Sequence, residues 1–195
     1  LRRGGQRDLG GRGPARGRLQ RGARRRAGQG GPDDQLPRAA GDHAAVELLP
    51  SLLGDEPSGR LHKRLTEQGL AAGTFGFNFA LADPSMLFFG AQLSPGQSVA
   101  QAREQMLATL ESVAREPITH EELERARVRW LNAWDQQFTN PESVGLALSE
   151  SIAQGDWRLY FLQRDRVREL KLEDVQRVAT QRLLPDNRTL ATYLP

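Results

Sequence analysis

One stretch of the chain alternates strictly between large apolar residues and small or polar ones. Its large members are Phe75, Phe77, Phe79 and Leu81. This period of two predicts a strand over residues 72–81 with one aromatic, buried face. A second strand is expected over residues 86–93. The connection through Asp83 and Pro84 is short, so the two strands are expected to form an antiparallel hairpin.

From about residue 42 onward, most of the chain shows helical periodicity, with apolar residues three and four positions apart. Ser98 is expected to cap one helix, and Thr119 with Glu122 forms a capping box for the next. Asn140 precedes a proline, a residue favoured at the first helical position. Further helices are expected over residues 43–53, 59–68 and 172–183, and after Asp156.

The order of these elements is a helix pair, the hairpin, several helices and a final strand over residues 189–194. This order predicts an α+β fold, in which helices pack on one face of an antiparallel sheet. The hydrophobic share of 38% can form a core, and the charged share of 26% indicates a soluble protein. No apolar run approaches the ~18 residues of a membrane helix, so no membrane contact is expected. The absence of cysteine excludes disulfides, thiolate metal sites and a cysteine nucleophile.

Residues 1–41 differ from the rest in composition, with eleven glycines and eleven arginines. Ten arginines against one acid give residues 1–31 a charge of +9, and the remainder carries −6. A segment with so few bulky apolar residues cannot bury enough surface to offset the entropy lost on ordering. We therefore expect a disordered, Arg/Gly-rich tail over residues 1–41 and a folded domain over residues 42–195.

Three interpretations of residues 1–41 stay open. Glycine, alanine, arginine and proline have GC-rich codons, so a GC-rich gene read out of frame would produce this composition. The segment could also be an inert tail. As a third possibility, its arginines could neutralise the phosphates of a nucleic acid. Aromatic residues that stack on bases are absent from it, so nucleic acid is the least expected partner.

No catalytic motif is visible in the sequence. The three histidines, His43, His62 and His120, are far apart, and none has a second histidine four positions on. Neither the HExxH nor the inverted HxxEH arrangement of helical zinc sites is therefore present. The paired acids Glu121 and Glu122 fall in the first turn of an expected helix, where they favour the helix dipole. We expect no catalytic residue, no metal ligand and no cofactor in this chain.

Six short segments stand out by their order and spacing: 42–47 (DHAAVE), 58–65 (SGRLHKRL), 69–71 (GLA), 155–158 (GDWR), 172–179 (LEDVQRVA) and 185–189 (PDNRT). Together they resemble the non-catalytic domain of the pitrilysin/insulinase family of zinc peptidases. The resemblance covers residues 42–195, about four fifths of the chain.

This resemblance implies a metallopeptidase-like α/β roll and a particular division of labour. In the family, a domain with the HxxEH zinc motif and a homologous domain without it close into a chamber around a peptide. This chain resembles the second kind, from a longer bacterial enzyme with tandem domains. The implied partners are a zinc-bearing homologous domain or subunit and a peptide substrate, with zinc bound only on the partner. A periplasmic location would follow if the chain is like its bacterial relatives.

The resemblance also points to Arg60 as a substrate-binding residue. In some members, an arginine at this position and a tyrosine just after the Gly-Leu-Ala segment contact the bound peptide. Here Ala72 stands at the tyrosine position. A structural role for Arg60, in which it caps or pairs within its own helix, is therefore an alternative to contact with the substrate.

Residues 1–41 do not resemble the family, whose domain opens with strands that complete its sheet. This mismatch favours a frameshift or truncation near residue 41. Without such strands, the hairpin at Phe75–Leu81 would have an unpaired edge and exposed aromatic side chains.

These observations predict a scaffold domain that helps enclose a peptide and does not catalyse by itself. Two alternatives stay open. One is an independent structural or interaction subunit, like the inactive relatives that serve as structural partners in respiratory complexes. The other is a nucleic-acid binder that uses its Arg/Gly-rich tail.

Overall fold

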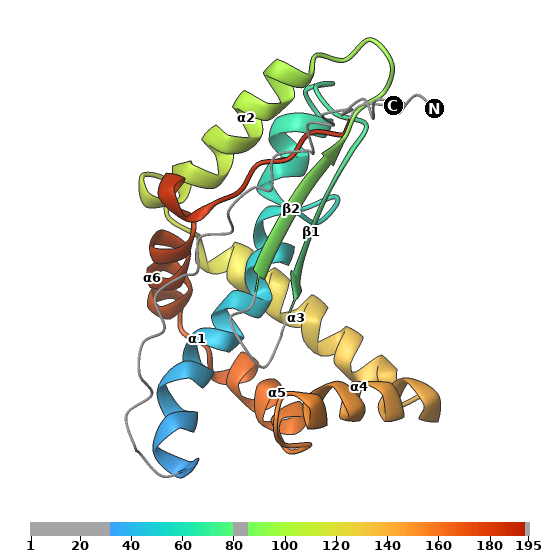
Figure 1. The fold of residues 1–195 in the computed structure, drawn as a ribbon, viewed down its shortest axis with the longest axis vertical. Coiled ribbons are helices and arrows are strands. Elements are labelled where there is room, and N and C mark those ends of the chain that lie inside the picture. Colours follow the sequence, from blue (N-terminus) through green and yellow to red (C-terminus); the bar gives the residue numbers. More distant parts are fainter. Residues whose placement is uncertain (1–31, 80–85, 194–195) are drawn as a thin grey trace, which may run out of the picture. The chain divides into compact units, whose positions relative to one another are not determined.

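Helix α1 (Pro32–Leu53) is the central element of the fold. The computed structural model describes residues 32–79 and 86–193, with side chains from residue 42 onward. In this part α1 contacts β1 (Gly73–Phe79), α3 (His120–Gln137), α5 (Leu159–Glu169) and α6 (Leu172–Arg182) (Figure 1). The remaining elements are the π-helical turn η1 (His62–Thr66), β2 (Met86–Gln92), α2 (Val99–Glu111), the 3-10 turns η2 (Ser112–Ala114) and η3 (Pro185–Asn187), and α4 (Pro141–Ala153).

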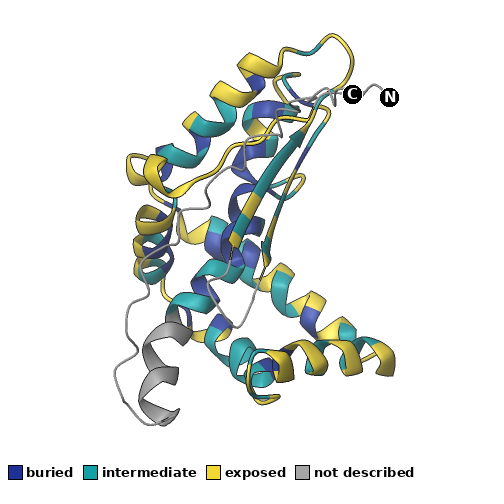
Figure 2. Cartoon of the chain, in the orientation of Figure 1, coloured by how far each residue is buried: buried dark blue, intermediate teal, exposed yellow. Residues whose placement is uncertain are grey.

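The main core forms around one face of α1. Figure 2 shows buried residues concentrated along this helix. Leu48, Leu49 and Leu53 are fully buried there, and each contributes about 1.5–3 kcal/mol through removal of its side chain from water. A second, smaller core lies where η1 meets α2, and its buried members are Leu61, Leu65, Ala71 and Ala102. Among the described helices, none has the length and apolar character needed to span a membrane.

Helix α1 begins at Pro32, well before the helix expected over residues 43–53. Proline is favoured at this first position because a helix needs no N–H there. The helix also continues through Pro50 to Leu53. Helix α1 thus spans residue 41, and the domain boundary predicted there stays a prediction.

Strands β1 and β2 form the predicted antiparallel hairpin. Phe77 lies opposite Phe88, and Thr74 lies opposite Ala91. Residues 81–85, which include the predicted turn, lie outside the described residues. Together with the helices, the hairpin confirms the predicted α+β fold class.

The prediction that the aromatic face of β1 is buried is wrong. Phe75, Phe77 and Phe79 are exposed, and the opposite face, with Thr74 and Gly76, lies against the helices. The reason is the close approach of the chain after α1: a Cβ on Gly54 would lie only 2.6 Å from the Gly76 nitrogen. Small residues on β1 permit this approach and large rings would not. The exposure also agrees with the expectation of exposed aromatic side chains on the hairpin.

The final strand predicted over residues 189–194 does not form in residues 189–193, where the described part of the chain ends. A strand needs a hydrogen-bonded neighbour. In the described residues, the sheet consists of β1 and β2 alone, and residues 188–193 pair with neither.

The helix starts predicted at Ser98, Thr119 and Asn140 are confirmed. The Ser98 hydroxyl accepts a hydrogen bond from the Gln101 N–H at 3.3 Å. Thr119 and Glu122 form both bonds of the capping box. Asn140 caps α4 through the Glu142 N–H, with proline at the first helical position. Each of these signals is local, which is why the sequence pattern located it correctly.

Candidate functional site: the Arg60–Glu122 pair

Arg60 lies in the short connection between α1 and η1, where a tight turn determines its direction. The Gly59 N–H donates to the Asp55 carbonyl at 2.6 Å. A Cβ on Gly59 would collide with the backbone of Asp55, so only glycine fits this position. The turn directs the Arg60 side chain into the interior, where only 9% of the residue is exposed.

The guanidinium of Arg60 makes four hydrogen bonds to the start of α3 and the loop before it. Nε and Nη2 donate to the two carboxylate oxygens of Glu122, at 2.8 and 2.7 Å. Nη1 donates to the Glu116 carbonyl at 2.6 Å, and Nη2 also donates to the Pro117 carbonyl at 2.8 Å. A two-pronged pair of this kind combines charge with a fixed geometry. It therefore fastens the segment after α1 to the first turn of α3.

Glu122 serves two structures at once. Its carboxylate closes the capping box by accepting from the Thr119 N–H at 2.8 Å, and it also holds Arg60. Burial raises the pKa of Glu122, but the hydrogen bonds from Arg60 and Thr119 and the charge of Arg60 outweigh this and lower the pKa to about 2. The hydrogen bond to Glu122 likewise raises the pKa of Arg60. Both groups are therefore charged at neutral pH.

A second arginine extends the network by one helical turn. Arg64 donates to the Ser112 hydroxyl at 3.2 Å and pairs with the Glu116 carboxylate. Arg60 and Arg64 thus join η1 to η2, to α3 and to the loop between them. These contacts make the network a clamp between parts of the chain that are some 50 to 60 residues apart.

The guanidinium of an arginine has five N–H donors. Arg60 already makes four hydrogen bonds to these partners. A peptide carbonyl would have to compete with bonds that already exist. The observed geometry supports a structural role, but through Glu122 on α3 and not through its own helix. The predicted contact between Arg60 and a substrate stays a prediction. Ala72, at the position of the family's tyrosine, is exposed just before β1.

Sequence reasoning placed Glu122 in a capping box and missed its bond to Arg60. The sequence signal for that bond is weak, because the two residues are separated by 62 positions. The one available signal is the glycine before Arg60, which permits a turn that buries the arginine. A buried charge needs a partner, so a carboxylate is expected nearby.

The histidines do not form a metal site in this structure. His62 approaches Glu56 and Glu67, at 3.4 and 3.9 Å, and His120 is exposed at the first position of α3. Among the side chains described, no group of three or more histidine, aspartate or glutamate residues could hold a metal ion. The described side chains therefore do not provide the ligand set of a zinc ion.

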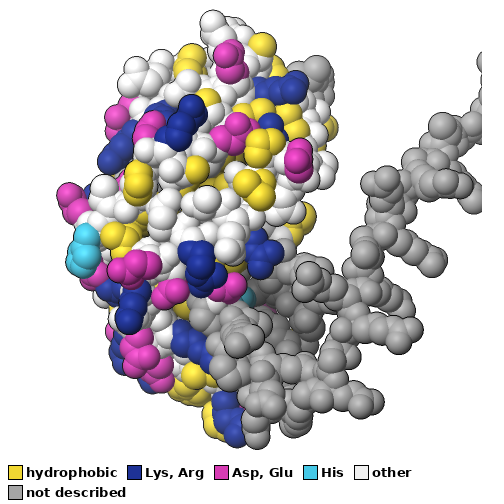
Figure 3. Space-filling view, turned by 90° about the vertical axis from the view of Figure 1, so that its left-hand side faces the viewer, with side chains coloured by type: hydrophobic (Ala, Val, Ile, Leu, Met, Phe, Trp, Pro, Cys, Tyr) yellow, Lys and Arg dark blue, Asp and Glu magenta, His cyan; other side chains and the backbone are white. Residues whose placement is uncertain are grey.

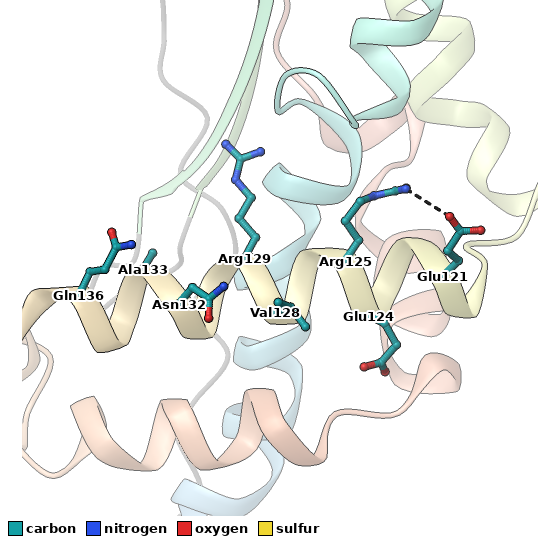
Figure 4. A pocket seen from close by; sticks show the side chains of 8 residues that line it. All are labelled: Glu121, Glu124, Arg125, Val128, Arg129, Asn132, Ala133 and Gln136. Atoms are coloured by element: carbon teal, nitrogen blue, oxygen red, sulfur yellow. Dashed lines mark ion pairs between the residues drawn. The ribbon is translucent and has the colours of Figure 1, made fainter.

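A shallow hollow of about 730 Å³ follows the outer face of α3. Figure 4 shows that its labelled side chains, from Glu121 to Gln136, all come from this one helix. Arg125 pairs with Glu121 at 3.5 Å, and Arg129 donates to the Glu56 carbonyl at 3.0 Å. Both arginines thus already have partners, and the lining groups follow one helix instead of converging on a common point, as catalytic groups would.

The described residues form a domain held together by internal ion pairs, and the comparisons with known proteins identify its family. The family model described as the peptidase M16 inactive domain matches residues 32–129, beginning at the first residue of α1. The chain belongs to this family. The resemblance to the non-catalytic domain of pitrilysin/insulinase-type zinc peptidases is thereby confirmed.

Two solved structures from Bordetella are similar over most of their length. A candidate zinc protease from Bordetella pertussis Tohama I is 52% identical, with 80% of this chain and 86% of that chain covered and a TM-score of 0.74. The inactive peptidase domain of a candidate zinc protease from Bordetella parapertussis is also 52% identical, with 80% and 85% covered and a TM-score of 0.75. No curated protein matches the chain.

A protease from Helicobacter pylori is similar in fold alone. It is 24% identical with a TM-score of 0.65, and the match covers 72% of this chain and 34% of that protein. The chain therefore corresponds to about a third of that protease.

Proposed function

We propose that this chain is the peptide-enclosing scaffold of a zinc metallopeptidase, and that a homologous domain with the HxxEH motif supplies the zinc and the general base. That domain would lie elsewhere on the same polypeptide or on a separate chain. The observation that carries the proposal is the 52% identity, over most of both chains, with a domain described as an inactive peptidase domain.

The described side chains support a scaffold role. The Arg60–Glu122 pair holds the segment after α1 against α3, so the outer surfaces of both elements keep a fixed relation. No described group fits a metal ion, so the chemistry would come from the partner. Rigid positioning of a peptide beside a catalytic group can by itself contribute greatly to rate.

The experiment is a reconstitution. The full chain is mixed with an HxxEH-bearing homologous domain from the same genome, and cleavage of a fluorogenic peptide library is measured for each component alone and for the mixture. We expect cleavage by the mixture that a chelator abolishes, and none by this chain alone. A partner whose HxxEH glutamate is replaced by glutamine is the control. Chelator-sensitive cleavage by this chain alone would contradict the proposal.

The alternative of an independent structural subunit has one specific observation in its favour, the exposed aromatic face of the hairpin. The same mixture distinguishes the two functions. A stable complex without any gain in cleavage would favour the structural subunit. The nucleic-acid alternative depends on the Arg/Gly-rich segment, most of which lies outside the described residues, and it stays a prediction.

A further inference from the structure

Five large apolar side chains form one exposed surface on the hairpin, called here the ring face. They are 37–53% exposed and comprise Phe75, Phe77, Phe79, Met86 and Phe88. The rings contact each other: Phe77 stacks on Phe88 and meets Phe79 edge-on, each with centroids 4.8 Å apart. The ring face is therefore continuous and already ordered.

A glycine on the neighbouring strand leaves room for one of these rings. Gly90 lies directly opposite Phe75, and a Cβ on Gly90 would collide with the Phe75 ring. The ring consequently lies across β2. Exposed rings of this kind are suited to packing against other rings, since aromatic rings gain from stacked and edge-on contacts.

Neither strand carries a charged residue or a proline: β1 reads GTFGFNF and β2 reads MLFFGAQ. Sheets that face water generally carry such residues as protection against association. The face of the molecule with α2 and α6 shows the usual pattern, with acidic and basic side chains interspersed (Figure 3). The hairpin thus differs from the helical surface in lacking the residues that prevent contact with another chain.

The outer edge of β1 is partly blocked. The Thr74 N–H, which points away from β2, donates to the Glu56 carboxylate at 2.9 Å. A carboxylate at this position opposes the addition of a further strand, because it occupies a donor that the new strand would need. The open surface is consequently the ring face and not this end of the edge.

The exposed fractions correspond to roughly 400 Å² of apolar area per copy, given ~150–250 Å² for each large side chain. This lies within the ~300–600 Å² of the largest patches on monomers, which are often functional. Two copies would bury about 800 Å² from the rings alone. This area approaches the ~1,000 Å² that a specific interface requires.

We propose that a second copy of this chain packs its ring face against this one, across a two-fold axis close to Phe77 and Phe88. Charged groups across an interface select a particular unlike partner, and the ring face carries none. An array of rings can pack against an identical array, as a two-fold interface requires. The inference goes beyond the proposed function, and it can be tested without any zinc-bearing partner.

The first test compares two matched pairs of substitutions by sedimentation velocity on the full chain over a range of concentrations. Phe77→Thr with Phe88→Thr removes the two central rings and retains strand propensity. Leu146→Thr with Ile152→Thr removes two apolar side chains that are even more exposed, 65% and 60%, from α4. We expect a concentration-dependent dimer that the hairpin pair weakens at least about tenfold and the α4 pair leaves unchanged. Equal weakening by both pairs, or a monomer at every concentration, would overturn the proposal.

The second test leaves the rings intact and does not depend on the folding of the first variants. The chain has no cysteine, so Gln92→Cys creates a unique labelling site on an exposed residue at the end of β2. A spin label there gives one narrow intermolecular distance in a closed two-fold dimer. Open-ended growth with a broad distance distribution would show edge-to-edge stacking and overturn the face-to-face arrangement. Raised salt should leave the dimer intact, because apolar burial rather than charge holds it.

Discussion

The Arg60–Glu122 pair and the ring face of the hairpin reverse the usual distribution of polar and apolar groups. In the first region a charged arginine lies in the interior with four hydrogen bonds. In the second, large rings lie at the surface. The contrast separates two sources of order: the ion pair connects distant segments of one chain, whereas the rings contact chiefly each other. We expect the first region to govern stability and the second to govern association.

Removal of the interior charge should have the largest effect. Arg60→Met leaves the Glu122 carboxylate and two loop carbonyls without their donor, so we expect a loss of about 3–4 kcal/mol in the free energy of unfolding. Urea denaturation measures it. Arg125→Met, which removes a partner of the exposed Glu121, serves as the control and should change stability by less than about 0.5 kcal/mol. Equal losses for the two variants would refute the special status of the interior pair.

Acid should remove most of the same stabilisation. The pKa of Glu122 falls from 4.5 to about 2 on folding, so the folded state gains stability above about pH 4.5 and loses it as the pH falls toward 2. The expected loss is about 3 kcal/mol from this group. Denaturation curves measured at a series of acidic pH values test this, and Glu122→Gln should flatten the acid limb. An acid limb that is the same with and without the Glu122 carboxylate would contradict the assignment.

The contact between the end of α1 and the hairpin should come next. In Gly54→Ala, the new methyl group would meet the backbone of Gly76, and we expect a loss of about 1–3 kcal/mol through overpacking. Thermal unfolding followed by circular dichroism measures the change. Gly145→Ala on α4 is the control, because a Cβ there meets no described atom within 4 Å. If Gly145→Ala lowered the stability and Gly54→Ala did not, the contact between Gly54 and Gly76 would not be tight.

The smallest effect on folding should come from the ring face. Phe77→Thr removes a ring whose aromatic contacts are with its neighbours on the ring face, so we expect a loss of less than about 1 kcal/mol, measured by urea denaturation under monomeric conditions. A loss as large as that of Arg60→Met would mean that the ring face is part of the core, and the contrast between the two regions would fail.

Local signals in the sequence located many features of this fold correctly. The alternation of Phe75, Phe77 and Phe79 predicted β1, and Ser98 and Thr119 marked the starts of two helices. Such signals depend on neighbouring residues only, so no knowledge of the rest of the fold is needed. The sequence likewise contains no HxxEH motif, and the family resemblance drawn from its short segments is confirmed.

The tertiary structure decided what depends on distant neighbours. A period of two predicts a strand but not which face is covered, and the approach of Gly54 to Gly76 determined that the rings point outward. The partner of Arg60, 62 positions away, became identifiable only when α3 was in place. Residues 189–193 have strand-like composition, yet in the described part they lack a neighbour to pair with. By itself the sequence determined the local elements and the family; packing determined faces, partners and edges, because these are properties of contacts between segments far apart in the chain.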